Sequence, residues 1–113
     1  MKEIKAIIQP FKLTEVIKEL QKNEGLPGVT ISDIKGFGKT RAMNAAEKVI
    51  DDLIEYVPKK KIEIVVHDDM VDKILDVIQS KAHTGNPGDG KIFVVNVENV
   101  VKIRTNERGE SAI

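Results

Sequence analysis

The stretch IKAIIQPFKLTEVIKELQ, from Ile4 to Gln21, has a second version in IEIVVHDDMVDKILDVIQ, from Ile62 to Gln79. The two stretches lie 58 positions apart and align without a gap, so that Ile7 falls on Val65. Each opens with a run of β-branched residues, which favours a buried strand. Each continues with apolar residues spaced as i, i+3, i+4 and i+7, the pattern of an amphipathic helix. The repeat therefore predicts two successive strand–helix units.

A further strand is expected after each helix, in GVTISDIKG from Gly28 and in KIFVVNVENVVKIRT from Lys91. Two β-α-β units predict an α+β, ferredoxin-like fold, an antiparallel sheet with both helices on one face. Pro10 and the pair Asp68–Asp69 mark the expected helix starts, and the aspartates are expected to cap free amides. Because Ile, Val and Phe crowd the strands, we expect the uncovered face to be buried by self-association.

Composition narrows the class of protein. A chain of 113 residues, here read as one domain over 1–113, is long enough for a modest core. Lys and Arg balance Asp and Glu, 18 against 18, so no global field attracts nucleic acid or an anionic membrane. No cysteine occurs, which excludes disulfide frameworks and thiolate chemistry. Without a long apolar run, no membrane insertion is expected, and the expected location is cytoplasmic.

The segment between the two halves fits neither template. From about residue 38 to residue 58 it forms a long connection, which in a small domain is usually functional or flexible. Apolar residues at helical spacing run from Ala42 to Ile54, and Pro58 should end any such helix. Two readings stay open: a third core helix, or a projecting element that meets a partner with its apolar side.

The stretch HTGNPGDGK, from His83 to Lys91, resembles a phosphate cradle. It is not a P-loop, because Ile92 replaces the required Ser or Thr and a strand, not a helix, is expected next. What remains is a glycine-rich turn whose amides could bind an anion beside Lys91, or simply a turn. Three other corners, KGFGK at Lys35, PKKK at Pro58 and KIRTNERG at Lys102, carry further cations, which together favour a polyphosphate ligand.

Other chemistries have little support. His67 and His83 stand sixteen positions apart with no cysteine nearby, so no metal site is expected. The serines lack the context of a nucleophile, which argues against a serine hydrolase. Glu63, in the middle of a predicted strand, could be a solvent-facing residue or a site carboxylate.

Five blocks in order carry a resemblance to a known family: AIIQPFKL at Ala6, GVTISDIKGFG at Gly28, PKKKIEIVVHDD at Pro58, TGNPGDGKIFV at Thr84 and IRTNERGESAI at Ile103. The chain resembles the PII-type signal-transduction proteins nearly end to end. The resemblance implies a homotrimer, not an enzyme, that binds ATP or ADP in three clefts between subunits. It also implies a regulator of nitrogen metabolism that responds to 2-oxoglutarate and docks on a target protein through a long loop.

Transferred by position, the resemblance implies a set of nucleotide-binding residues. Around adenine and ribose would lie Ile7, Gly36, Phe37, Gly38, Glu63, Ile64 and Val65, with Val29 and Thr30 nearby. The phosphates would contact Gly88, Asp89, Gly90 and Lys91, in a loop over about 84–91. Gly28, Lys39 and Thr84 belong to the nucleotide site without a more specific assignment. Lys102 and Arg104, in a C-terminal loop over about 102–113, would reach the phosphates from a neighbouring subunit. Lys102 stands where the family usually has arginine. Lysine keeps the positive charge but cannot bind a phosphate through two parallel N–H groups as a guanidinium does.

The long loop, about 38–58, departs from the family. Thr40 replaces the glutamine that helps hold Mg²⁺ and 2-oxoglutarate, whereas Lys59, which pairs with the oxoacid carboxylate, is retained. Asp52 replaces the tyrosine that is uridylylated, so no uridylylation site is expected. We therefore expect that the protein binds ATP and ADP, that Mg²⁺ could accompany the nucleotide, and that 2-oxoglutarate binds weakly or not at all. We also expect the loop to recognise its target protein through residues that differ from those of the family. The target could be an ammonium channel, a metabolic enzyme or a transport system.

Two alternatives to this reading remain. The first is a small ferredoxin-like hydrolase of phosphates or acylphosphates. An acylphosphatase-like site requires an arginine in the loop after the first strand, and that loop, QPFK at residues 9–12, has none. The second is a structural trimer without a ligand.

Overall fold

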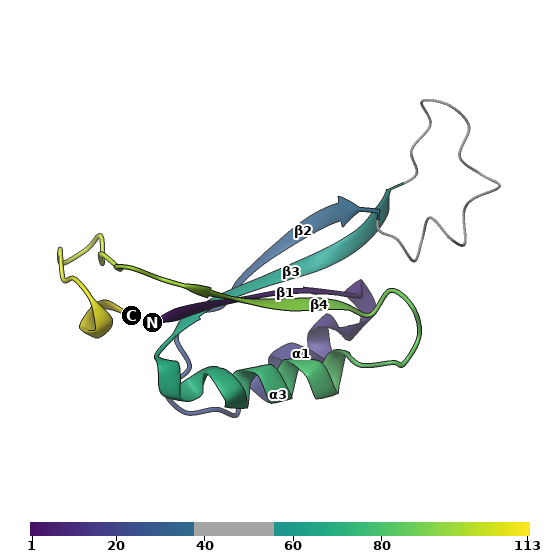
Figure 1. Cartoon of the computed structure of the whole chain (residues 1–113), viewed down its shortest axis with the longest axis horizontal. Helices are drawn as coiled ribbons and strands as arrows, with labels where there is room; N and C mark the ends of the chain where they lie inside the picture. Colours follow the sequence, from purple (N-terminus) through teal and green to yellow (C-terminus); the bar gives the residue numbers. More distant parts are fainter. Residues whose placement is uncertain (38–55) are drawn as a thin grey trace.

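The structure, a computed structural model, describes residues 1–37 and 56–113. Along the chain it places β1 (Lys2–Ile8), α1 (Leu13–Leu20), β2 (Thr30–Gly36), β3 (Val57–Val66), α3 (Val71–Ala82) and β4 (Gly90–Asn96). Short 3-10 helices at Pro10–Lys12, Asp68–Met70 and Glu110–Ala112 complete the described elements. The predicted helix over 42–54 lies outside the described residues. Figure 1 shows the sheet above the two helices, with the C-terminal segment beyond one end of the sheet.

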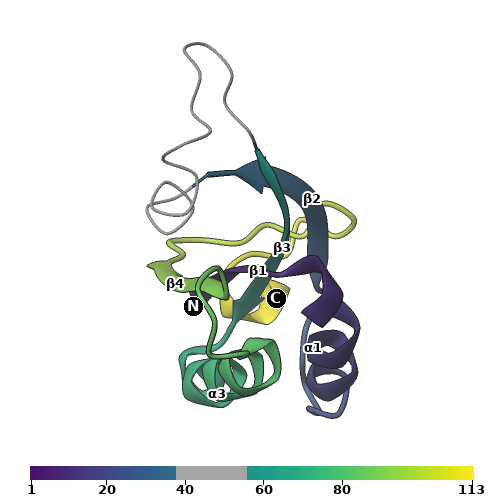
Figure 2. The same cartoon turned by 90° about the vertical axis from the view of Figure 1, so that its right-hand side faces the viewer.

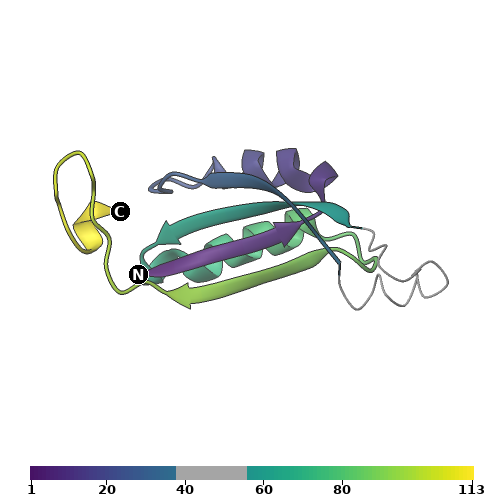
Figure 3. The ribbon, with the colours of Figure 1, turned by 90° about the horizontal axis from the view of Figure 1, so that it is seen from above.

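All four strands form one antiparallel sheet in the order β2-β3-β1-β4. Figure 3 shows this order from above, and Figure 2 shows α1 and α3 side by side on the same face of the sheet. The ferredoxin-like prediction is confirmed. The internal repeat is visible too, since β1 and β3 pair at the centre and each leads through a 3-10 turn into a helix.

The core lies between the sheet and the helices. Alternate residues of β1 and β3 are fully buried there, as the period of two along a strand requires. One face of each helix meets them with residues at helical spacing. The central members of this core are Ile4, Ala6, Ile8, Val16, Leu20, Ile62, Ile64, Val66, Ile74 and Ile78.

The opposite face of the sheet has no cover within the described chain and is only partly apolar. Residues that pair directly across strands share a face, so Thr30, Glu63, Lys5 and Phe93 form one row on it. Lys61, Ile7 and Lys91 form the next row. Charged residues thus alternate with apolar ones on this face, and its burial by self-association stays a prediction.

Two local predictions need correction. No side chain caps either helix; the carboxylate of Asp68 instead accepts a hydrogen bond of 2.9 Å from the amine of Met1. The last strand ends at Asn96 and does not continue toward Thr105. One further hydrogen bond, from the amide of Val97 to the carbonyl oxygen of Met1 at 3.1 Å, follows it. The chain then forms a separate turn, closed by a bridge between Val101 and Arg108. No helix within 1–37 and 56–113 is both long and apolar enough to cross a membrane.

Candidate functional site

The turn between α3 and β4 is held from inside by one carboxylate. Asp89 accepts hydrogen bonds from the backbone amides of Thr84, at 2.8 Å, and Gly85, at 2.9 Å, and from the Thr84 hydroxyl. These bonds, the one from the Thr84 hydroxyl first, lower the pKa of Asp89 from 3.8 to about 2. Asp89 is expected at the phosphates and Thr84 in the same nucleotide site. Because their side chains bond each other, the backbone amide of Asp89 is the group of that residue left for a ligand.

Glycine is required in this turn where the backbone leaves no alternative. Gly90 has φ +100°, and a Cβ there would lie 1.7 Å from the carbonyl oxygen of Ile7. Gly88 has φ +98°, a backbone conformation that residues with a side chain rarely adopt. Since β4 begins at Gly90, a strand follows the turn, as expected, and the P-loop stays excluded.

The turn has the donors of an anion site. Within the part of the chain that the structure describes, the backbone amides of Gly88 and Asp89 have no hydrogen-bond acceptor. Lys91 is exposed and pairs with Ile7 across β1 and β4, so its side chain lies on the open face of the sheet. Lys59 reaches the turn from β3 and donates to the carbonyl oxygen of Gly88. Two free amides beside two ammonium groups suit a phosphate or carboxylate ligand.

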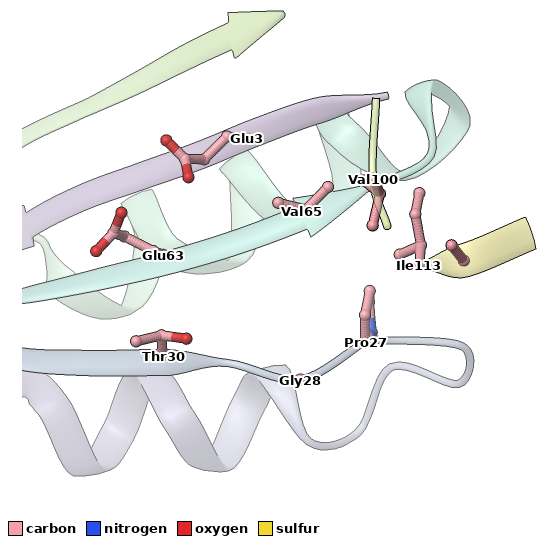
Figure 4. A pocket seen from close by; sticks show the side chains of 9 residues that line it. Glu3, Pro27, Gly28, Thr30, Glu63, Val65, Val100 and Ile113 are labelled. Carbon is pink, nitrogen blue, oxygen red and sulfur yellow. The ribbon is translucent and has the colours of Figure 1, made fainter. Parts of the chain in front are cut away.

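A cavity of about 330 Å³ lies at the other end of the open face (Figure 4). Three of its lining residues, Thr30, Glu63 and Val65, were expected around or near adenine and ribose, and a fourth, Gly28, was expected in the nucleotide site. The others were missed: Glu3, Pro27, Val100, Ala112 and Ile113. Strand alternation could have revealed Glu3, because it pairs with Val65. Nothing in the sequence indicated that the C-terminal turn folds back to this cavity. Of its lining groups only carboxylates, a hydroxyl and backbone are polar, so the cavity suits a flat, uncharged group with hydrogen-bond donors.

Five described residues of the expected base-binding set lie outside this cavity. Ile7 lies on the open face beside Lys91, and Gly36 and Phe37 are at the base of the long loop. The side chain of Ile64 is buried in the core and faces away from Glu63 and Val65, so only its backbone could meet a ligand. Val29 is half-buried and packs against the same core.

The two candidate regions are separated along the strands. The cavity residue Val65 pairs with Glu3, whereas Lys91 pairs with Ile7. Four positions along β1 correspond to ~13 Å at about 3.3 Å per residue, and both regions extend further outward. The glycine turn and the cavity therefore lie at opposite ends of one sheet.

Comparison with known proteins identifies the family. Residues 1–107 match the family model of the nitrogen regulatory protein P-II. The nitrogen regulatory protein P-II of Azospirillum brasilense is 47% identical over 113 residues, which cover all of both chains. Protein P-II 1 of Escherichia coli K12 is 45% identical over the same length and coverage. The chain belongs to the P-II family. Its relatives are named as regulatory proteins, and P-II proteins are regulators of nitrogen metabolism, not enzymes.

A solved P-II structure agrees with the fold. The crystal structure of Arabidopsis thaliana PII bound to citrate superimposes with a TM-score of 0.78 at 38% identity, over 99% of this chain and 91% of that one. Both the β-α-β repeat and the resemblance inferred from the sequence are thereby confirmed.

The remaining residues of the expected P-II site lie in the C-terminal turn, at the base of the long loop, or outside the described residues. Lys102, paired with Glu107 at 3.3 Å, and Arg104 belong to the C-terminal turn, beyond the cavity end of the sheet (Figure 1). Gly36 ends β2, and the ring of Phe37 faces that of Tyr56 at 6.2 Å, at the base of the long loop. Gly38, Lys39, Thr40 and Asp52 lie outside the described residues. Within 1–37 and 56–113, no group of three or more His, Asp or Glu side chains could hold a metal ion.

Proposed function

We propose that this P-II protein is a homotrimer that binds ATP or ADP in clefts between subunits and controls a target protein through its 38–58 loop. One observation supports the clefts best. In one chain the glycine turn expected at the phosphates lies at one end of the sheet, whereas three residues expected around or near the base, together with Lys102 and Arg104, lie at the other end.

A nucleotide would reach both kinds of residue if the glycine turn of one subunit faced the cavity of the next. The polarity of the two ends fits this arrangement. Lys91, together with the backbone amides of Gly88 and Asp89, would take the phosphates, and the cavity with Glu3 and Glu63 would take the base. Two carboxylates would repel phosphate from the cavity, which fixes the direction of the nucleotide.

The positions of Lys102 and Arg104 also support a nucleotide that is shared between subunits. They lie at the cavity end of their own chain, so they could meet phosphates only of a nucleotide that is shared with another subunit. Citrate bound to the Arabidopsis relative is another small polyanion and is consistent with an acidic ligand here.

Calorimetric titration with ATP and with ADP, combined with light scattering, tests the proposal. We expect a trimer, one nucleotide per chain, and negligible release of phosphate over hours. A trimer that binds neither nucleotide would indicate a structural assembly without a ligand. Rapid release of phosphate from ATP would instead favour the alternative of a hydrolase.

A further inference from the structure

Lys59 is an unusual lysine in this fold because its ammonium group is held against a backbone carbonyl. It pairs with Ile34 across β2 and β3, and it donates to the carbonyl oxygen of Gly88. Burial lowers the pKa of Lys59, and only the charge of Asp89 opposes that shift. Desolvating a lysine costs free energy, so stability alone does not explain why the ammonium is kept there.

The contact has a consequence for the next amide. The carbonyl of Gly88 and the N–H of Asp89 belong to one planar trans peptide, so they point in opposite directions. Because Lys59 holds the carbonyl, the Asp89 N–H is directed away from Lys59. That N–H has no acceptor among the residues that the structure describes.

The residue that carries this carbonyl gives the peptide little rigidity of its own. Gly88 has φ +98°, a conformation that glycine adopts readily and that can otherwise interconvert. The hydrogen bond from Lys59 thus holds a peptide that glycine alone would leave free to rotate.

We propose that Lys59 is a positioning residue of the glycine turn, which turns the Gly88–Asp89 peptide so that the Asp89 amide faces the anion. This inference rests on the proposed nucleotide binding and assigns Lys59 a role in phosphate binding that needs no oxoacid.

The test is ATP titration of Lys59→Met in buffer free of 2-oxoglutarate. We expect about tenfold weaker binding, because one charge-assisted amide contact is lost. Without ligand, the melting temperature should be unchanged or higher, since a partly buried charge is removed. Lys59→Arg, which can still donate to the carbonyl, should recover most of the affinity. Lys60→Met is the matched control, because the neighbouring Lys60 pairs with Asp33 on the other face of the sheet.

A double-mutant cycle with Gly88→Ala separates positioning from direct contact. The added Cβ displaces the peptide by itself, so adding Lys59→Met should then weaken ATP binding by less than about twofold. Independent, multiplying losses would mean that Lys59 acts on the ligand directly and would overturn the proposal. Unchanged ATP affinity in Lys59→Met would overturn it as well. Failure of the parent protein to bind ATP would instead remove the proposed function.

Discussion

The carboxylate of Asp89 accepts a hydrogen bond of 2.8 Å from the backbone amide of Thr84 and closes the glycine turn. Because the pKa of Asp89 falls from 3.8 to about 2, the folded chain stabilises the charged form. The resulting stabilisation is complete above the unfolded pKa and is lost as the pH falls toward the folded one.

We expect Asp89→Asn to lower the free energy of unfolding at neutral pH. The difference from the parent should shrink as the pH falls from about 5 to about 2. Urea denaturation at several pH values measures it, with Asp76→Asn, an exposed carboxylate on α3, as control. A difference that stays constant with pH would contradict the assignment.

The contact of Gly90 with β1 gives a sharper test of the backbone. Gly90→Ala should destabilise the protein by more than ~3 kcal/mol, because the Cβ would lie 1.7 Å from the Ile7 carbonyl oxygen. Gly25→Ala is the control: its φ is also positive, at +78°, but nothing lies within 4 Å of the added atom. It should cost only ~1 kcal/mol. Equal losses in thermal unfolding would show that the close approach is unimportant.

Assembly should depend on one face of β4. Phe93 and Val94 are adjacent and similarly exposed, at 46% and 42%, but they point to opposite faces of the sheet. Phe93→Asp places a charge on the open face and should dissociate the trimer at micromolar concentration, as measured by light scattering. Val94→Asp should leave the assembly intact. The same mass for both variants would show that the open face is not the interface.

The sequence of the long loop alone predicts how the protein responds to 2-oxoglutarate and to a uridylyltransferase. Thr40 has a short hydroxyl where the family has a longer amide, and Asp52 has no phenol. We therefore expect weak or no binding of 2-oxoglutarate to the ATP–Mg²⁺ complex in calorimetry. Incubation with a uridylyltransferase should leave the mass unchanged. Tight, ATP-dependent oxoacid binding would show that Thr40 replaces the missing amide.

The fold was predictable because its signals are local. Strand alternation and helical spacing repeat in both halves, and the buried residues of β1 and β3 follow from them. The end of β4 at Asn96 was not predictable from VENVV, because β4 is defined by its pairing with β1, a tertiary contact that local composition does not encode. The sequence also did not show that the carboxylate of Asp89 bonds to the amides of its own turn. A carboxylate beside glycines can bind a ligand or stabilise the turn, and composition does not distinguish the two. Glu3 and Ile113 enter the cavity through tertiary contacts that no spacing encodes.

Mixing two variants, each disabled at a different end of the sheet, tests most directly whether one nucleotide is shared by two chains. Lys91→Ala disables the phosphate end. Gly28→Tyr fills the cavity, and Gly28 tolerates a side chain because nothing lies within 4 Å of its Cβ position. Each variant alone should form a trimer that binds no ATP. Mixed trimers from equal amounts of both should recover about a quarter of the sites, because some interfaces then join two intact ends. If calorimetry on the mixed trimers shows no recovered sites, the nucleotide is bound within a single chain and the account is wrong.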